Sequence, residues 1–297
     1  SFGAMQYKLA EMATKTYVAD AGNYRAGQNI EDQIARLEHN GHNPQEAKLK
    51  GVEEYAIECA ILKVFGSEVI QYATDEAIQI YGGMGFSAES AVEAFYRDAR
   101  ISRIYEGTNE INRLLLVKMI LKKAMTGEID VMKSAKAVAK ELMSIPSFDT
   151  PSETFFAEEK KVLQNLKKSI LMIAGTAAQK LGDKIALEQE VMMNIANMII
   201  EVYMLESALL KTEKLVHKDG NEVHDEKISM CISYLHHAVE EVRKNGKEAL
   251  FAILEGDEQK MLLMGLKRFT KVQATNLKEH RRKIAKKMIE ENEYCFD

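Results

Sequence analysis

Apolar residues recur three and four positions apart along nearly the whole chain, a spacing that gives an α-helix one buried face. Few residues interrupt this pattern, since only three prolines and seventeen glycines occur in 297 residues. Ala, Leu, Met, Glu and Lys, which favour long helices, are abundant. The sequence therefore predicts an all-α fold, and its 46% hydrophobic content suffices for one large domain or two smaller ones.

Charge and cysteine content exclude several function classes. The net charge is -5, whereas a surface that binds nucleic acid normally carries a basic excess, so no nucleic-acid partner is expected. The three cysteines are far apart and form no CxxC pair, which argues against a disulfide framework or a thiolate metal site and favours a reducing compartment. The Glu-x-x-His motifs of di-iron bundles are absent from the sequence, so no metal is expected.

Residues that cap helices mark several boundaries in the first half. Asn43, Pro44 and Glu46 are typical of a helix start, and we expect a long helix from there to about Tyr81. Gly82 and Gly83 are expected to end it, because glycine tolerates the left-handed conformation that closes a helix. The apolar residues predicted to form its buried face are Val52, Ala56, Cys59, Ala60 and Val64.

A loop from Met84 to Ser90 should lead to a short helix over residues 91–100. Thr108 is then expected to be the N-cap of another helix that stops near Gly127. This helix is predicted to carry its apolar residues on one side: Ile111, Leu114, Leu115 and Met119.

Residues 145–151 hold two of the three prolines and are the best candidate boundary. We predict a first helical domain over 1–128, a linker over 129–151, and a second helical bundle over 152–297. Thr150, Pro151 and Glu153 should start the second bundle, with helix ends at Gly182, Gly220 and near Gly256. Its predicted buried stripe consists of Ile195, Met198, Ile199, Val202 and Leu205.

Two segments carry a functional pattern: Gln79-Ile-Tyr-Gly-Gly-Met-Gly-Phe86 and Tyr96-Arg-Asp-Ala-Arg-Ile-Ser-Arg-Ile-Tyr-Glu-Gly-Thr-Asn-Glu110. Together they resemble the C-terminal signature of the acyl-CoA dehydrogenases. The resemblance extends from Phe2 to about Lys118 and is closest to the very-long-chain branch, whereas beyond about residue 130 it is only architectural. The family's N-terminal helical domain and central β-domain have no counterpart in the chain. We therefore expect it to be the C-terminal part of a longer enzyme and to be inactive alone.

The resemblance implies that Glu106 is the general base. In the straight-chain members, this glutamate takes the α-proton of a fatty acyl-CoA while hydride leaves the β-carbon for FAD, which gives the trans-2-enoyl-CoA. Tyr105 would line the acyl cavity, and Gly107 would leave room for the thioester. A glutamate before a helix is, by itself, more often a solvated or capping residue, and only the flanking match favours the base. Glutamate at this position argues against the branched-chain types.

The resemblance also implies FAD contacts and a homodimer. One set of residues matches a segment that touches FAD bound mainly by the partner subunit: Gln79, Ile80, Tyr81, Gly82 and Gly83. A second set matches a stretch that contacts FAD in the same subunit: Thr108, Asn109 and Glu110. Glu110 departs from the pattern, because many relatives have an uncharged amide there. Three further matching residues were interpreted as structural ion pairs that hold the loop: Arg97, Asp98 and Arg113.

Electrons would pass to an electron-transferring flavoprotein. The alternative to an enzyme is a helical scaffold or assembly factor built on the same fold, which need not reduce flavin. We expect a cytoplasmic location in a bacterium, and the sequence does not fix the preferred acyl chain length. A basic stretch near the end is interpreted as a solvated helix face, with peripheral membrane contact as the less favoured alternative. It comprises Lys278, Arg281, Arg282, Lys283, Lys286 and Lys287, beside apolar Ile284, Met288 and Ile289.

Overall fold

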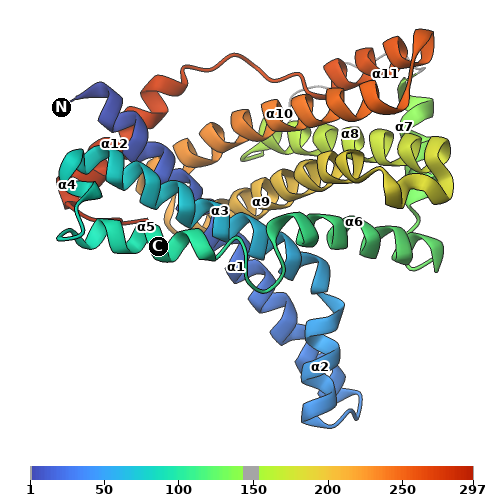
Figure 1. Cartoon of the computed structure of the whole chain (residues 1–297), viewed down its shortest axis with the longest axis horizontal. Helices are drawn as coiled ribbons and strands as arrows, with labels where there is room; N and C mark the ends of the chain where they lie inside the picture. The colour runs from blue at the N-terminus through green and yellow to red at the C-terminus, as the bar shows by residue number, and fades with distance from the viewer. Residues whose placement is uncertain (1, 143–153, 297) are drawn as a thin grey trace. The chain divides into compact units, whose positions relative to one another are not determined.

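The computed structural model describes residues 2–142 and 154–296, and over these ranges it contains helices and turns but no strand (Figure 1). The all-α prediction is therefore confirmed. Contacts group the chain into two compact units: the first comprises Ser1–Asn112 with Arg281–Asp297, and the second comprises Arg113–His280. Both division points, after Asn112 and after His280, fall inside helices. The predicted boundary at 145–151 and the predicted helix start at 150–153 lie outside the described residues.

The first unit is organised around two long helices, α1 (Gly3–His39) and α3 (Ala56–Tyr81). Helix α2 (Pro44–Glu54) packs back on α1, while α4 (Gly83–Phe86) and α5 (Ala91–Ile101) pack on α3. Much of α12 (Leu277–Glu291) also belongs to this unit. The fully buried Tyr17 on α1 and Ile61 on α3 mark its core.

The helix start at Asn43 is confirmed, because the Asn43 Oδ1 accepts a hydrogen bond from the Glu46 N–H at 2.9 Å and Pro44 is the first helical residue. The single long helix to Tyr81 is wrong. The chain turns at Tyr55, whose N–H bonds to the Val52 carbonyl three residues back, and a separate helix follows. This turn changes the buried face, so Val52 is half-exposed whereas residues 60 and 64 are buried as predicted.

The cap of α2 gives a direct stability prediction. Replacing Asn43 by alanine should lower the free energy of unfolding by about 1 kcal/mol, because the Glu46 N–H loses its acceptor. Asn43→Asp keeps the acceptor and should remain close to the parent. Denaturant unfolding followed by circular dichroism measures both. Equal stability of Asn43→Ala and the parent would show that the cap contributes nothing.

Glycines shape the end of α3. Gly82 has φ +62° and ψ −144°, a conformation open almost only to glycine, and it ends α3 as predicted. Gly83 instead starts the one-turn helix α4, so the predicted loop after it is partly helical. A Cβ on Gly85 would lie 2.7 Å from the Ile78 carbonyl oxygen, so the return of the chain onto α3 requires glycine there.

Helix α6 (Asn109–Met125) starts with the predicted cap, since the Thr108 Oγ1 accepts from the Ile111 N–H at 3.3 Å. It ends two residues before Gly127, as predicted. Its predicted apolar face is partly wrong, because Ile111 and Leu115 are exposed in this chain, whereas the next positions, Leu116 and Val117, are buried. Helix α7 (Val131–Leu142) follows.

The second unit contains a helical bundle of α8 (Ala157–Leu181), α9 (Gln189–Asp219), α10 (Asp225–Ile253) and α11 (Gly256–Phe269). Short 3-10 turns, η1 (Gly182–Leu187) and η2 (Glu222–His224), flank α9. Helices α9 and α10 pair along their length, and α8 packs against both (Figure 1). The predicted stops at Gly182 and Gly220 are confirmed, with φ +50° and +93°. Near Gly256, α10 ends at Ile253.

Helix α9 forms the centre of this bundle. Four residues of its predicted stripe are buried, and only Ile199 is partly exposed. By length and composition α9 is the one helix among the described residues that could span a membrane, but 56% of its most apolar stretch is buried inside the protein. This burial is that of a core helix in a bundle.

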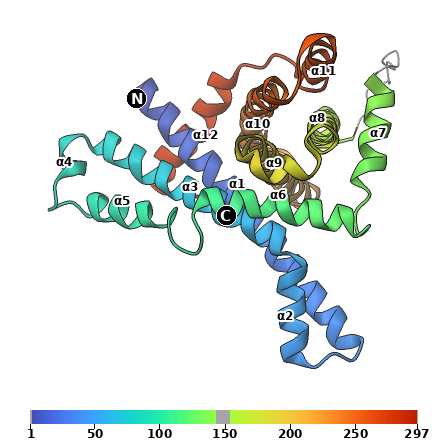
Figure 2. The ribbon, with the colours of Figure 1, turned by 45° about the vertical axis from the view of Figure 1, so that its right-hand side comes forward.

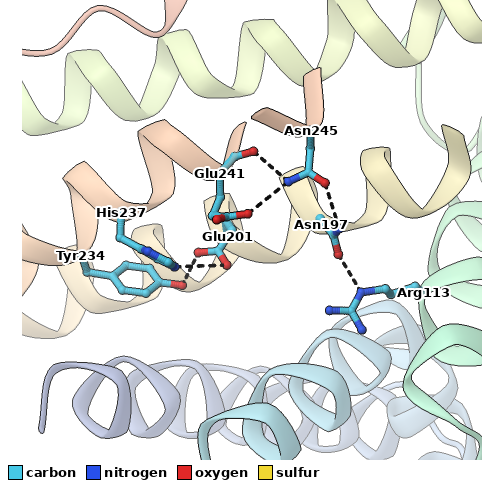
Figure 3. Close-up of polar contacts among 7 residues, drawn as sticks. All are labelled: Arg113, Asn197, Glu201, Tyr234, His237, Glu241 and Asn245. Atoms are coloured by element: carbon cyan, nitrogen blue, oxygen red, sulfur yellow. Dashed lines mark hydrogen bonds and ion pairs between the residues drawn. The ribbon is translucent and has the colours of Figure 1, made fainter. Parts of the chain in front are cut away.

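A chain of polar side chains crosses the second unit (Figure 3). The Arg113 Nε on α6 donates to the Asn197 Oδ1 on α9 at 2.6 Å, and the Asn197 Nδ2 donates to the Asn245 Oδ1 on α10 at 2.9 Å. Asn245, which is 3% exposed, in turn donates to the Glu241 carbonyl at 2.8 Å. Three helices are thus connected through the partly buried Asn197 and the buried Asn245, and the Asn245 amide is also satisfied by the Glu241 carbonyl.

Candidate functional site

The loop between α5 and α6 presents Glu106 in an unusual backbone conformation. Glu106 has φ +55° and the following Gly107 has φ +82°, so the chain turns through the left-handed region at two successive residues. For glutamate, which carries a Cβ, this conformation costs about 1–3 kcal/mol and persists only where the surroundings impose it. The Glu106 side chain is exposed. The strained backbone therefore holds a carboxylate outward at a fixed point.

Two side chains from different helices hold this loop. The Lys63 Nζ on α3 donates to the Gly107 carbonyl oxygen at 2.6 Å. The Asn112 side-chain amide, one turn into α6, donates to the carbonyl oxygens of Gly107 at 2.8 Å and Thr108 at 3.1 Å, and more weakly to that of Glu106 at 3.4 Å. These bonds stabilise the turn that the backbone alone disfavours.

Asn109 lies inside the first unit rather than on its surface. It is 0% exposed, and its side-chain oxygen accepts from the Lys63 Nζ at 2.9 Å while its amide donates to Ser67 Oγ at 3.0 Å and Glu68 Oε1 at 3.1 Å. Its side chain is therefore occupied in anchoring α6 to α3. Its backbone is enclosed as well, and its N–H donates to the Arg103 carbonyl oxygen at 3.1 Å, so Asn109 is not open to the predicted contact with FAD.

The neighbouring predicted FAD residues differ from Asn109 in exposure. Glu110 is exposed in the first turn of α6, and Thr108 is partly exposed with its hydroxyl capping the helix. The first turn of a helix leaves backbone N–H groups without helical partners, which suits an anionic group.

The other predicted FAD segment lies at the opposite end of α5. Gln79, Tyr81, Gly82 and Gly83 are exposed, and Ile80 is partly exposed, where α3 ends. Figures 1 and 2 both place α4 at one end of α5 and the loop before α6 at the other. Gly107 bonds to Lys63, and α3 continues from Lys63 to Tyr81, so a stretch of helix roughly 27 Å long separates the two segments. The structure does not bring the two predicted cofactor-binding sets together at one point.

A cofactor could approach the backbone closely at the end of α3. A Cβ built on Gly82 or Gly83 would meet nothing within 4 Å, so this stretch of backbone borders open space. A bare glycine backbone beside open space is suited to contact with a flat or anionic group. These residues therefore fit the FAD contact implied by the sequence.

Two of the three residues interpreted as ion pairs around the loop, Arg97 and Arg113, bond to residues outside it. The Arg97 Nη2 pairs with Glu93 Oε1 at 2.9 Å, within α5 itself, and Arg113 bonds to Asn197. The loop is held instead by Lys63 and Asn112, which sequence reasoning missed. The sequence did contain a signal for Lys63. Lys63 and Ser67 lie one helical turn apart and interrupt a helix face that is otherwise apolar.

The electrostatics of Lys63 reflect its position. Partial burial lowers the pKa of its ammonium group from the ordinary value, while the carboxylates of Glu110, Glu68 and Glu106 act in the opposite direction. One ammonium group thus lies among three carboxylates. Among residues 2–142 and 154–296, no group of three His, Cys, Asp or Glu side chains is arranged to hold a metal ion.

Comparisons with known proteins match both halves of the chain. Two family models, both described as "Acyl-CoA dehydrogenase, C-terminal domain", match residues 1–121 and 165–268. A probable acyl-CoA dehydrogenase of Bacillus subtilis is 38% identical over 99% of this chain and 49% of its own length. The mitochondrial very long-chain specific acyl-CoA dehydrogenase of Rattus norvegicus is 42% identical over 39% of this chain and 15% of its own length.

A solved structure matches nearly the whole chain. The crystal structure of an acyl-CoA dehydrogenase complexed with FAD from Bacillus anthracis has a TM-score of 0.94 and 40% sequence identity, and the match covers 99% of this chain and 50% of that one. The chain thus spans about half the length of the relatives that it matches throughout. Family models match both halves of the chain, and relatives are similar to it along nearly its entire length. The chain therefore belongs to the acyl-CoA dehydrogenase family.

Proposed function

We propose that this chain supplies the catalytic base and part of the FAD site of an enzyme that oxidises a fatty acyl-CoA to the trans-2-enoyl-CoA. The observation that carries the proposal is the backbone of Glu106. An exposed glutamate is held in a left-handed conformation by two helices, inside the segment that resembles the catalytic signature of the family. Strain of this kind is concentrated at functional sites.

The Glu106 carboxylate would take the proton from the α-carbon, as a general base positioned on a fixed turn. The electron pair of the broken C–H bond forms the α,β double bond as hydride leaves the β-carbon, and bound FAD supplies the hydride acceptor. Gly107, without a side chain, leaves space beside the base for the thioester. Tyr105, which is 52% exposed in this chain, offers an apolar ring next to the base to line the acyl cavity.

FAD would contact two groups of residues. Glycine backbone and exposed side chains at the end of α3 form one group: Gln79, Ile80, Tyr81, Gly82 and Gly83. The start of α6 forms the other, through Thr108 and Glu110. The separation of these groups along α5 supports a homodimer in which each group serves a different FAD.

The solvated helix face is favoured over a membrane contact for the terminal basic stretch. Ile284 on α12 is buried, and the Arg281 Nε donates to Glu11 Oε1 at 2.7 Å, so this part of the helix packs on the protein. We also propose that an electron-transferring flavoprotein accepts the electrons and that the protein is located in the cytoplasm of a bacterium.

The test uses flavin absorbance of the protein expressed from its complete gene. Under anaerobic conditions, saturated acyl-CoA thioesters of increasing chain length should bleach the bound FAD, and the chain length that reacts fastest identifies the preferred substrate. FAD that stays oxidised with every chain length would overturn the dehydrogenase and favour a non-enzymatic scaffold.

A further inference from the structure

We propose that Lys63 is a positioning residue for the catalytic base: from α3, its ammonium group fixes the Glu106 turn through the Gly107 carbonyl and Asn109. This inference rests on the proposed role of Glu106. Lys63 need not touch substrate or FAD, because it acts through the loop. Its effect should therefore appear in the rate of flavin reduction more than in substrate binding.

The geometry around Gly107 supports this role. Its carbonyl oxygen accepts two donors, the Lys63 Nζ at 2.6 Å and the Asn112 Nδ2 at 2.8 Å. Asn112 comes from α6, immediately after the loop, so its bonds are local. Lys63 lies 44 residues earlier in the sequence, and its bond connects the turn to a different helix, α3. Without it, the loop keeps its local bonds but loses the charged donor from α3.

The same ammonium group also binds the buried start of α6. Its bond to Asn109 Oδ1, at 2.9 Å, joins a cluster with Ser67 and Glu68 on α3. Asn109 is fully buried, so its bonds to Ser67 are shielded from competing water, whereas its bonds to Lys63 and Glu68 are partly buried. Lys63 thus contacts the residues on both sides of Thr108, and the loop that carries Glu106 is held at its C-terminal end by a single charged side chain.

Charge gives Lys63 a second effect that packing alone would not have. Its neighbours include the carboxylates of Glu68 on α3, Glu106 in the loop and Glu110 on α6. Arg100 and Arg103 lie farther along, where they line a groove together with Glu68. The ammonium group attracts all three carboxylates. Removing it leaves like charges that repel one another, which should loosen the turn.

Lys63→Met tests the inference because methionine keeps an unbranched chain without the charge or the donors. In the flavin-loaded protein from the complete gene, flavin reduction per bound FAD should slow by about 10²-fold, as expected when a reacting group is misplaced by about 1 Å. KM should change little, because Lys63 need not touch the substrate. Lys63→Arg, which keeps charge and donors, should recover most of the rate.

Controls separate this inference from the proposed function. Lys48→Met, at an exposed lysine on α2, should behave as the parent. Glu106→Gln, measured in parallel, reports on the base itself. If Glu106→Gln is inactive while Lys63→Met keeps the parent rate, the positioning role is wrong and the base remains. A Lys63→Met variant whose loss lies in KM rather than in the rate, or a Lys63→Arg as slow as Lys63→Met, would equally overturn it.

Discussion

Replacing Glu106 by glutamine should slow reduction of bound FAD by fatty acyl-CoA about 10²- to 10⁴-fold, the range that a positioned general base contributes. Glutamine has nearly the same shape and the same backbone preference, so the turn at φ +55° should survive the change. The lost function is proton acceptance alone. Stopped-flow absorbance under anaerobic conditions, normalised to bound FAD, measures the rate.

Two further variants sharpen this result. Glu106→Asp keeps a carboxylate but withdraws it by one methylene, so it should react faster than Glu106→Gln and more slowly than the parent. Glu89→Gln, at an exposed glutamate in the loop before α5, should leave the rate unchanged. Parent-like bleaching of Glu106→Gln would keep the enzyme but move the base to another residue.

Features fixed by adjacent residues were predictable from sequence. Asn43 and Thr108 cap helices because a short polar side chain reaches its own first turn, and Gly82 and Gly220 end helices because only glycine takes those angles cheaply. The role of Glu106 as base was also inferred from a contiguous segment, and it stays a prediction. Interactions between residues close in sequence can be recognised from a short segment of that sequence.

Features that depend on distant partners were not predictable. The break at Tyr55 follows no proline or glycine, and the exposed side of α6 is decided by what packs on it. The Lys63 clamp joins residues 44 positions apart, so its partner could not be read from the segment around it. The left-handed φ of Glu106 could not be read either, because glutamate does not favour it and distant bonds impose it.

The grouping of the last residues of the chain with the first unit likewise depends on distant partners. Residues 281–297 were predicted to belong to the second bundle, yet their contacts group them with residues 1–112. Arg281 pairs with Glu11 and stacks over the Tyr7 ring, 4.8 Å from its centroid. An ion pair across 270 residues has no signature in a window of sequence.

Replacing Asn197 by leucine should lower the free energy of unfolding by about 3 kcal/mol, because two hydrogen-bonding groups each lose a partner at a cost of about 1–3 kcal/mol. Leucine fills a similar volume but can neither accept from Arg113 Nε nor donate to Asn245 Oδ1 (Figure 3). Asn245 is buried, so water replaces the lost donor poorly. Denaturant unfolding followed by circular dichroism measures the loss.

A double-mutant cycle determines whether the loss comes from the amide pair. Asn245→Leu should also destabilise, but the double replacement should cost less than the sum of the single ones, since two leucines leave no amide of this pair unsatisfied. Asn221→Leu, at an exposed asparagine, should change stability by no more than about 0.5 kcal/mol. Strict additivity of Asn197→Leu and Asn245→Leu would show that the amides act independently. The coupling of α9 to α10 would then rest on their apolar faces alone.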